Sequence, residues 1–357
     1  MKYFILLMSL VLRIEWNTCD AKAVFGTAPC MYAGDYDPTG YNCETKAMDP
    51  SLLPTTCTSF VYDPIVFVDA QSANDLDIDD DFNIIGLISM DKPLYLYVNY
   101  DRTQCSADAA DNTEHVIANI KHLIDNYSIT GFILLNLDLN STINCDDKLK
   151  QYVNLVKQNT SCQIGLYVNA RNIIDNTNNA SATGWFDFEE LNNIMDYYII
   201  GFEMFNPCND LYKGGIVPLN NDQNNTYSLT TFANALNNSM IAKDKIYLQF
   251  SLSPTINDTT TEHLSKCCVT YRKYCENDHY NRYWCADNAD SLYQKGRFAR
   301  DIHTRGIVVK YIDTIDPTAT CGCNNQDKFI TFSMMLRGYF SEDPIEDCAK
   351  LNYITDT

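Results

Sequence analysis

The chain has 357 residues, of which 46% are apolar and 20% are charged, so it is long enough to build one large core or two ordinary ones. Its 46 acidic residues outnumber its 26 basic residues, and the net charge of −20 would repel phosphate backbones and anionic lipid headgroups. These numbers exclude a disulfide mini-protein and argue against a protein that binds nucleic acid or docks on membranes through basic residues.

The N-terminus has the form of a secretory signal peptide. An apolar run extends from Tyr3 to Leu12, and a polar stretch then ends at Ala23 in a small-x-small cleavage pattern. The run is shorter than the roughly 20 apolar residues of a membrane helix. We therefore expect residues 1–23 to be a signal peptide, residues 24–357 to form a single domain, and the mature protein to be secreted and extracellular.

Short apolar runs alternate along the rest of the chain with stretches of helical periodicity. The runs predict strands at Ala23–Thr27, Ser59–Val68, Leu94–Asn99, Gly131–Leu139, Gln163–Asn169, Tyr197–Met204, Lys245–Leu252 and Gly306–Ile312. The periodic stretches predict helices at Ala107–Tyr127, Asp146–Gln158, Phe188–Met195, Ser228–Leu236 and Asp290–Thr304. Apolar strands that alternate with helices are typical of a parallel sheet buried on both faces, and their number indicates an α/β fold, the (β/α)₈ TIM barrel.

A short cysteine-rich insertion interrupts this pattern between expected strands 7 and 8. The stretch from Pro254 to Asn288 holds several cysteines and tyrosines together with Trp284. Aromatic side chains near a barrel mouth can stack on sugar rings. The alternative is a loop pinned by disulfides around a local aromatic core.

The cysteine count supports an oxidising compartment. The chain has 15 cysteines, more than a cytosolic protein usually keeps reduced. Cleavage after Ala23, or after Cys19 as the alternative, removes Cys19 and leaves an even number, which is consistent with complete disulfide pairing. The paired Cys-x-x-Cys elements of zinc ribbons do not occur, so we predict no metal site and no cofactor.

Asn-x-Ser/Thr sequons are frequent, and each can carry an N-glycan in a secreted protein if it is exposed. The alternative is that a chain rich in Asn and Thr generates such tripeptides by chance. The expected glycosylation sites are Asn126, Asn140, Asn159, Asn179, Asn224, Asn237 and Asn257.

Several segments resemble, in the right order, those of glycoside hydrolase family 18, the chitinases. Cys57-Thr-Ser-Phe-Val-Tyr is similar to the Cys-Thr-His-Leu-Ile-Tyr that opens the family's second strand, and Gly131-Phe-Ile-Leu is similar to the entry into its catalytic strand. Asp196-Tyr-Tyr-Ile-Ile resembles its sixth strand, and Arg305-Gly-Ile-Val-Val resembles its eighth. The resemblance implies a (β/α)₈ barrel and a disulfide between Cys30 and Cys57.

The acidic residues of the family's catalytic strand have no full counterpart here. The family uses an Asp-x-x-Asp-x-Asp-x-Glu run, in which Glu protonates the glycosidic oxygen and the neighbouring Asp holds the substrate's attacking acetamido group. With Gly131 fixing the register, the four acidic positions fall on Thr130, Ile133, Leu135 and Leu137. In the other register, with Asp138 as the middle acid, the last three positions are Asn136, Asp138 and Asn140. An amide cannot act as general acid, so we expect no catalytic residues and no hydrolysis.

Three further elements of the family pattern are replaced. Lys310 stands where the family's eighth strand carries the Trp on which the sugar ring stacks. Gly201-Phe-Glu203-Met replaces the sixth-strand Met-x-Tyr-Asp, and Asn99-Tyr-Asp101 replaces the third-strand Gly-Gly-Trp. The resemblance therefore implies an inactive chitinase homologue, a pseudoenzyme.

The expected strand ends still offer groups for a ligand groove. The candidate groove residues are Asn99, Tyr100, Asn136, Asp138, Glu203 and Asp313. We predict a secreted protein that binds chitin or N-acetylglucosamine-containing glycans, or that acts as an extracellular signalling or effector protein. One alternative is a glycosylated storage or structural protein without a ligand site. Another is a glycosidase whose acid has moved to Asp138 or Glu203.

Overall fold

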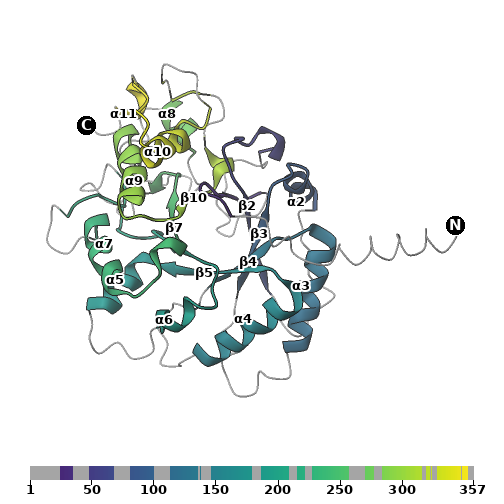
Figure 1. Cartoon of the computed structure of the whole chain (residues 1–357). Helices are drawn as coiled ribbons and strands as arrows, with labels where there is room; N and C mark the ends of the chain where they lie inside the picture. The colour runs from purple at the N-terminus through teal and green to yellow at the C-terminus, as the bar shows by residue number, and fades with distance from the viewer. Residues whose placement is uncertain are drawn as a thin grey trace.

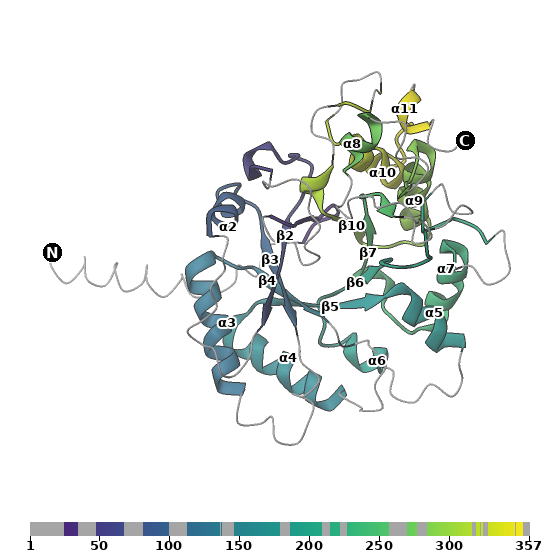
Figure 2. The same cartoon turned by 180° about the vertical axis from the view of Figure 1, so that it is seen from behind.

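The chain folds around a closed barrel of parallel strands whose spatial order is β1-β10-β7-β6-β5-β4-β3-β2. Helices surround this barrel, as Figures 1 and 2 show from opposite sides. The architecture is therefore the (β/α)₈ barrel that the sequence pattern predicts. The computed structural model describes residues 25–34, 48–67, 81–99, 113–135, 137, 146–178, 186–208, 215–221, 227–256, 270–276, 284–315, 319–321, 323, 328–346 and 348–352.

The expected elements match the observed ones except near their ends and at the first strand. The barrel strands are β1 Cys30–Tyr32, β2 Phe60–Phe67, β3 Leu94–Asn99, β4 Gly131–Leu135, β5 Gln163–Asn169, β6 Tyr197–Gly201, β7 Ile246–Ser251 and β10 Gly306–Lys310. The helices are α2 Asp81–Ile88, α3 Thr113–Tyr127, α4 Asp146–Thr160, α5 Ala170–Asn178, α6 Phe188–Leu191, α7 Leu229–Asn238, α8 Tyr271–Glu276, α9 Ala289–Asp301, α10 Ile330–Phe340 and α11 Ala349–Asn352. Short 3-10 turns lie at η1 Pro50–Leu52, η4 Lys243–Lys245 and η6 Ile312–Thr314. Among the described residues, no helix is both long and apolar enough to cross a bilayer.

The prediction of a strand at Ala23–Thr27 is wrong, because the first barrel strand begins only at Cys30. Gly26 interrupts an extended conformation with a φ of +81°. The apolar residue beside it instead enters the barrel, where the Phe25 ring stacks on Tyr197 with centroids 4.6 Å apart and meets Tyr95 edge-on at 4.5 Å. Phe25 thus fills the barrel interior and takes no part in its wall.

Tyrosine rings fill the barrel interior beside glycines of the neighbouring strands. A Cβ on Gly165 would lie 2.1 Å from the Tyr197 ring, and one on Gly201 would lie 2.0 Å from Tyr167 Oη. The same arrangement joins Tyr95 to Gly131 and Tyr247 to Gly306. Large rings can therefore fit between closely spaced strands only where the adjacent residue has no side chain.

Tyrosine rings of the barrel interior form hydrogen bonds through their hydroxyls. Tyr95 donates to Gln163 Oε1 at 2.8 Å, and Tyr247 donates to the Gly26 carbonyl at 2.8 Å. Burial raises the pKa of both phenols and of Tyr197 well above the ordinary value, because it penalises the charged form. The interior of the barrel is thus a neutral, close-packed core.

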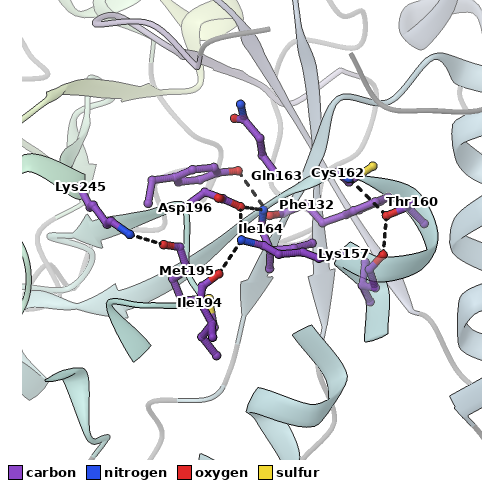
Figure 3. A network of polar contacts seen from close by, with 12 residues as sticks. Phe132, Lys157, Thr160, Cys162, Gln163, Ile164, Ile194, Met195, Asp196 and Lys245 are labelled. Carbon is purple, nitrogen blue, oxygen red and sulfur yellow. Dashed lines mark hydrogen bonds and ion pairs between the residues drawn. The ribbon is translucent and has the colours of Figure 1, made fainter. Parts of the chain in front are cut away.

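A polar network ties helices α4 and α6 to the beginnings of strands β5 and β6 (Figure 3). Asp196 accepts a hydrogen bond from the Ile164 backbone N–H at 2.7 Å and forms an ion pair with Lys157 at 2.8 Å. Lys157 also donates to the Ile194 carbonyl at 2.5 Å, and Lys245 donates to the Met195 carbonyl at 2.8 Å. The two lysines satisfy carbonyls that follow α6, and so fix the entry of the chain into β6.

Disulfides connect the insertion to the rest of the barrel. The segment between β7 and β10 contains an antiparallel pair, β8 Thr255–Ile256 and β9 Trp284–Cys285, with helix α8 between them. Tyr271, Tyr274 and Trp284 of this segment are buried, as in the alternative of a local aromatic core. The disulfides among the described residues are Cys30–Cys57, Cys208–Cys285, Cys275–Cys321 and Cys323–Cys348.

We predict that peptide mapping of the unreduced protein will recover Cys30 joined to Cys57, the pair that links β1 to the start of β2. The two cysteines are 27 positions apart. On the chain-entropy account, replacing both with alanine should lower the free energy of unfolding by about 3–4 kcal/mol. Recovery of Cys30 joined to another cysteine would contradict this pairing.

A second prediction concerns the space beside Tyr197. The change Gly165→Ala should lower the free energy of unfolding by about 1–3 kcal/mol, because the new methyl group overlaps a buried ring. The control is the same change in a Tyr197→Leu background, where the ring is gone and the cost should be smaller. Equal costs in the two backgrounds, measured by denaturant unfolding, would show that the ring is not the cause.

Candidate functional site

The carboxyl ends of the barrel strands form the candidate site. In a parallel barrel these ends meet on one face, where enzymes of this architecture place their chemistry. The last residues of the strands from β3 onward are Asn99, Leu135, Asn169, Gly201, Ser251 and Lys310. Hydrogen-bond register pairs Asn99 with Leu135, Asn169 with Gly201, and Ser251 with Lys310.

Strand β4 presents apolar side chains to this face. Gly131 begins the strand and pairs with Tyr95 and Gln163. Ile133 is fully buried in the barrel interior, and Leu135 is partly buried against the same cluster. Leu137, just beyond the strand, is buried in the outer core. In the register that Gly131 defines, the last three carboxylate positions of the resembled motif are therefore filled by packed hydrocarbon, and the first is the buried Thr130.

An ion pair joins β10 to the turn after β6. The Lys310 ammonium contacts Glu203 Oε1, although the two residues are 107 positions apart in the chain. The Lys310 side chain is only 13% exposed and Glu203 is 40% exposed. Lys310 Nζ also lies 4.7 Å from the centre of the Tyr311 ring. The position of the expected sugar-stacking Trp thus holds a half-buried, charge-neutralised pair.

The turn that carries Glu203 is held by side chains from the end of β5 and the start of α5. Asn169 Nδ2 donates to the Glu203 carbonyl at 3.5 Å, and Arg171 donates to the Met204 carbonyl at 3.2 Å. Met204 has a left-handed backbone with φ of 49°, and its side chain is 80% exposed. An apolar side chain is thereby held in solvent at the edge of the mouth.

A second set of contacts supports the same edge. The Arg171 guanidinium lies 4.8 Å from the centre of the Tyr227 ring, whose hydroxyl donates to Asp175 at 2.8 Å. Buried Asn206 donates to the carbonyls of Ile216 and Tyr227 at 2.9 and 2.8 Å. These bonds connect the described segments around the end of β6.

Below the mouth, the barrel floor contains a buried amide. Gln249 Nε2 donates to Tyr97 Oη at 2.9 Å and contacts Met31 Sδ at 3.2 Å. Gln249 is 2% exposed, and its Oε1 has no hydrogen-bond partner among the described residues. The floor is therefore polar at one point in an otherwise aromatic and aliphatic interior.

The expected groove residues fall into three groups. Glu203 lies at the mouth in the ion pair described above. Asp313 holds the end of β1, because its two carboxylate oxygens accept the backbone N–H groups of Ala33 and Gly34 at 3.1 and 3.0 Å. Asn99 ends β3, but its side chain lies outside the described residues, as do Tyr100, Asn136 and Asp138 entirely.

The sequence identified both members of the ion pair but not their contact. It marked Lys310 as a lost stacking residue and Glu203 as a possible displaced acid, and no spacing links the two. Arg171 and Gln249 were not identified at all, and Met204 was named only as the end of an expected strand. Arg171 follows an apolar run and Gln249 interrupts one, and many other polar residues share these positions.

Comparison with solved structures shows the fold of family-18 chitinases. The Group IV chitinase of Ostrinia furnacalis has a TM-score of 0.66 at 14% identity, over 88% of this chain and 100% of that one. Human YKL-39, described as a pseudo-chitinase with retained chitooligosaccharide binding properties, has a TM-score of 0.65 at 12% identity, over 88% and 99%. An immunomodulatory active chitinase from Trichuris suis has a TM-score of 0.62 at 13% identity, over 87% and 98%.

At these identities the likeness extends to the fold alone, and the neighbours include both chitinases and a pseudo-chitinase. The sequence matches no protein-family model and no curated protein.

We predict that Glu203→Gln will lower the free energy of unfolding by about 1–2 kcal/mol, because it leaves the Lys310 ammonium half-buried without a carboxylate. The matched control is Glu276→Gln, which breaks an exposed pair with Arg272 at 3.1 Å and should cost less than about 0.5 kcal/mol. In a Lys310→Met background the Glu203→Gln cost should shrink. Equal costs for the two glutamine variants in denaturant unfolding would contradict a specific pair at the mouth.

Proposed function

We propose that this protein is secreted, binds oligosaccharides of N-acetylglucosamine at the carboxyl end of its barrel, and does not hydrolyse them. The observation that carries the proposal is the Lys310–Glu203 ion pair. It occupies the position at the mouth where the resemblance puts a stacking Trp, and the described inward residues of the fourth strand are apolar.

Several features argue against hydrolysis. Glycosidase chemistry needs a proton donor beside the scissile bond, together with either a second carboxylate or a held acetamido group. Ile133 and Leu135 have no acidic proton to transfer, and both pack in the barrel interior, Ile133 fully buried and Leu135 partly buried. Asp313 is engaged by two backbone N–H groups. Glu203 is therefore the one carboxylate of the described mouth that is left as a candidate acid.

Other features support retained binding. Arg171, Asn169 and Asn206 hold the turn after β6 in one conformation, and a preformed site loses less entropy when a ligand binds. Exposed Met204 and half-buried Tyr227 offer apolar surface for sugar rings beside groups that form hydrogen bonds. The structural neighbour YKL-39 is described as combining the loss of chitinase activity with retained binding.

Secretion is supported by the disulfides and the N-terminal sequence. Four disulfides lie among the described residues, and bonds of this kind persist in oxidising compartments. The apolar run and the cleavage pattern before Ala23 supply a means of export.

A glycosidase with a displaced acid is the second candidate, and it is favoured by the place of Glu203 directly after a barrel strand, with 40% of its side chain exposed. In that case Glu203 would donate the proton and a carboxylate from another loop would act as its partner. The ion pair with Lys310 argues against this role, because the ammonium competes with a substrate oxygen for the same carboxylate.

We predict no measurable turnover of a chromogenic chito-oligosaccharide under conditions in which an active family-18 chitinase is readily measured. Neither Leu137→Glu nor Asn140→Glu alone should restore it. The Leu137 side chain is buried in the outer core and not in the barrel interior, and a proton donor at position 140 gains little while the acetamido group is unheld and the ring lacks its platform. Turnover by the wild type near 1 s⁻¹ or faster would overturn the proposal. Its loss in Glu203→Gln or Asp138→Asn would then assign the acid.

A further prediction is that the protein will be retained on chitin beads and will bind soluble chito-oligosaccharides in calorimetry. Cello-oligosaccharides, which lack the acetamido group, should bind more weakly. Lys310→Met should weaken binding by about tenfold, since it frees Glu203 and rearranges the mouth. The control Lys350→Met, in α11, should leave binding unchanged. A secreted protein without any retention on chitin would support the storage or structural alternative.

A further inference from the structure

The three described sequons occupy the same structural position. Asn126, Asn159 and Asn237 are each the second-last residue of a barrel helix, α3, α4 and α7 respectively. All three asparagines are exposed. In each case the serine of the sequon is the first residue after the helix.

These helix ends lie at the amino end of the barrel. Helices α3, α4 and α7 are followed by strands β4, β5 and β7, which begin at Gly131, Gln163 and Ile246. A helix that returns the chain to the start of a parallel strand must end on the face opposite the strand's carboxyl end. Helices α3 and α4 also lie side by side (Figures 1 and 2), and Lys121 of α3 donates to Asn159 Oδ1 of α4 at 3.4 Å.

Two of the sequon serines have a backbone conformation that serine disfavours. Ser128 and Ser161 have φ values of 51° and 58°, in the left-handed region where a helix normally ends in Gly or Asn. Both serines are exposed, so packing against the core does not explain why serine, and not Gly or Asn, occupies these two positions. Ser239 differs, because its buried hydroxyl donates to the Leu236 carbonyl at 2.9 Å.

We propose that Asn126, Asn159 and Asn237 carry N-linked glycans, which cover the amino end of the barrel. In the transfer step, Asn Nδ2 forms a bond to the anomeric carbon of an oligosaccharide carried on a lipid diphosphate. The bond from that carbon to the diphosphate breaks, the lipid diphosphate leaves, and one Nδ2 proton is released. The inference rests on the secretion part of the proposed function and is independent of sugar binding at the mouth.

Two lysines beside these asparagines can be used to measure how far glycans shield the amino end of the barrel. Lys121 Nζ lies 3.4 Å from Asn159 Oδ1, and Lys243 Nζ lies 2.6 Å from Asn237 Oδ1. A glycan on either asparagine would shield its lysine from reagents in solution. Exposed Lys350 of α11 serves as a control, since no described sequon lies on that helix.

The first experiment maps site occupancy on the full chain secreted from a eukaryotic host. Enzymatic glycan release in heavy-oxygen water converts each occupied Asn to labelled Asp, which peptide mass spectrometry then locates. We expect label at all three positions. If the chain's own leader does not direct export, a standard leader supplies the same material; that result contradicts the secretion proposal alone. Export without label at these asparagines overturns the glycan proposal.

Substitutions at the serines separate the glycan from the backbone. Ser128→Gly and Ser161→Gly should each abolish one glycan, whereas Ser128→Thr and Ser161→Thr should retain it. In protein made without glycosylation, both glycine variants should unfold at higher denaturant concentration than the wild type, because glycine relieves the left-handed strain. Retention of the glycan in the glycine variants would overturn the assignment of these sites.

Lysine acetylation with a small reagent tests the covered face. Removal of the glycans from the native protein should raise labelling of Lys121 and Lys243 severalfold and leave Lys350 unchanged. Unchanged labelling of Lys121 and Lys243 would overturn the shielding of this end of the barrel.

Discussion

The closed barrel depends on the fit between large aromatic rings and glycine backbones in its interior. A barrel of parallel strands has room for few side chains, and here several of them are tyrosines. Gly165 beside Tyr197 and Gly201 beside Tyr167 leave the space that those rings fill, since a Cβ at either glycine would overlap the ring. The buried hydroxyls must then find partners inside the protein. Phe25, which precedes the first strand, completes this packing inside the barrel.

This interior also determines what the mouth can do. Strand β4 enters the core at Ile133 and Leu135, so its inward positions contribute to packing and carry no charge. The charged groups at the described mouth come from other elements, the end of β10 and the turn after β6. Because Lys310 and Glu203 neutralise each other there, a ligand meets a polar but balanced surface. Such a surface suits a neutral glycan better than a strongly charged one.

The two ends of the barrel therefore differ in character. At the carboxyl end, the disulfide-linked insertion and the anchored turn after β6 extend beyond the ends of the strands. At the amino end, lysines bind the carbonyls between α6 and β6, and the last turns of three helices present exposed asparagines. The net charge of −20 favours solubility through repulsion between molecules, and the disulfides are of a kind that persists in an oxidising compartment.

The sequence by itself determined the α/β alternation, the strand positions at Leu94–Asn99 and Gln163–Asn169, and the absence of a full acidic motif near Gly131. These features are local, because apolar periodicity and residue identity are written along the chain. The sequence misplaced the first strand, which begins at Cys30. The apolar run before Cys30 has the same pattern whether it forms part of the barrel wall or fills the barrel interior. Only the tertiary structure brought Lys310 to Glu203, because barrel closure sets which strand ends become neighbours, and no local pattern encodes a contact between distant segments.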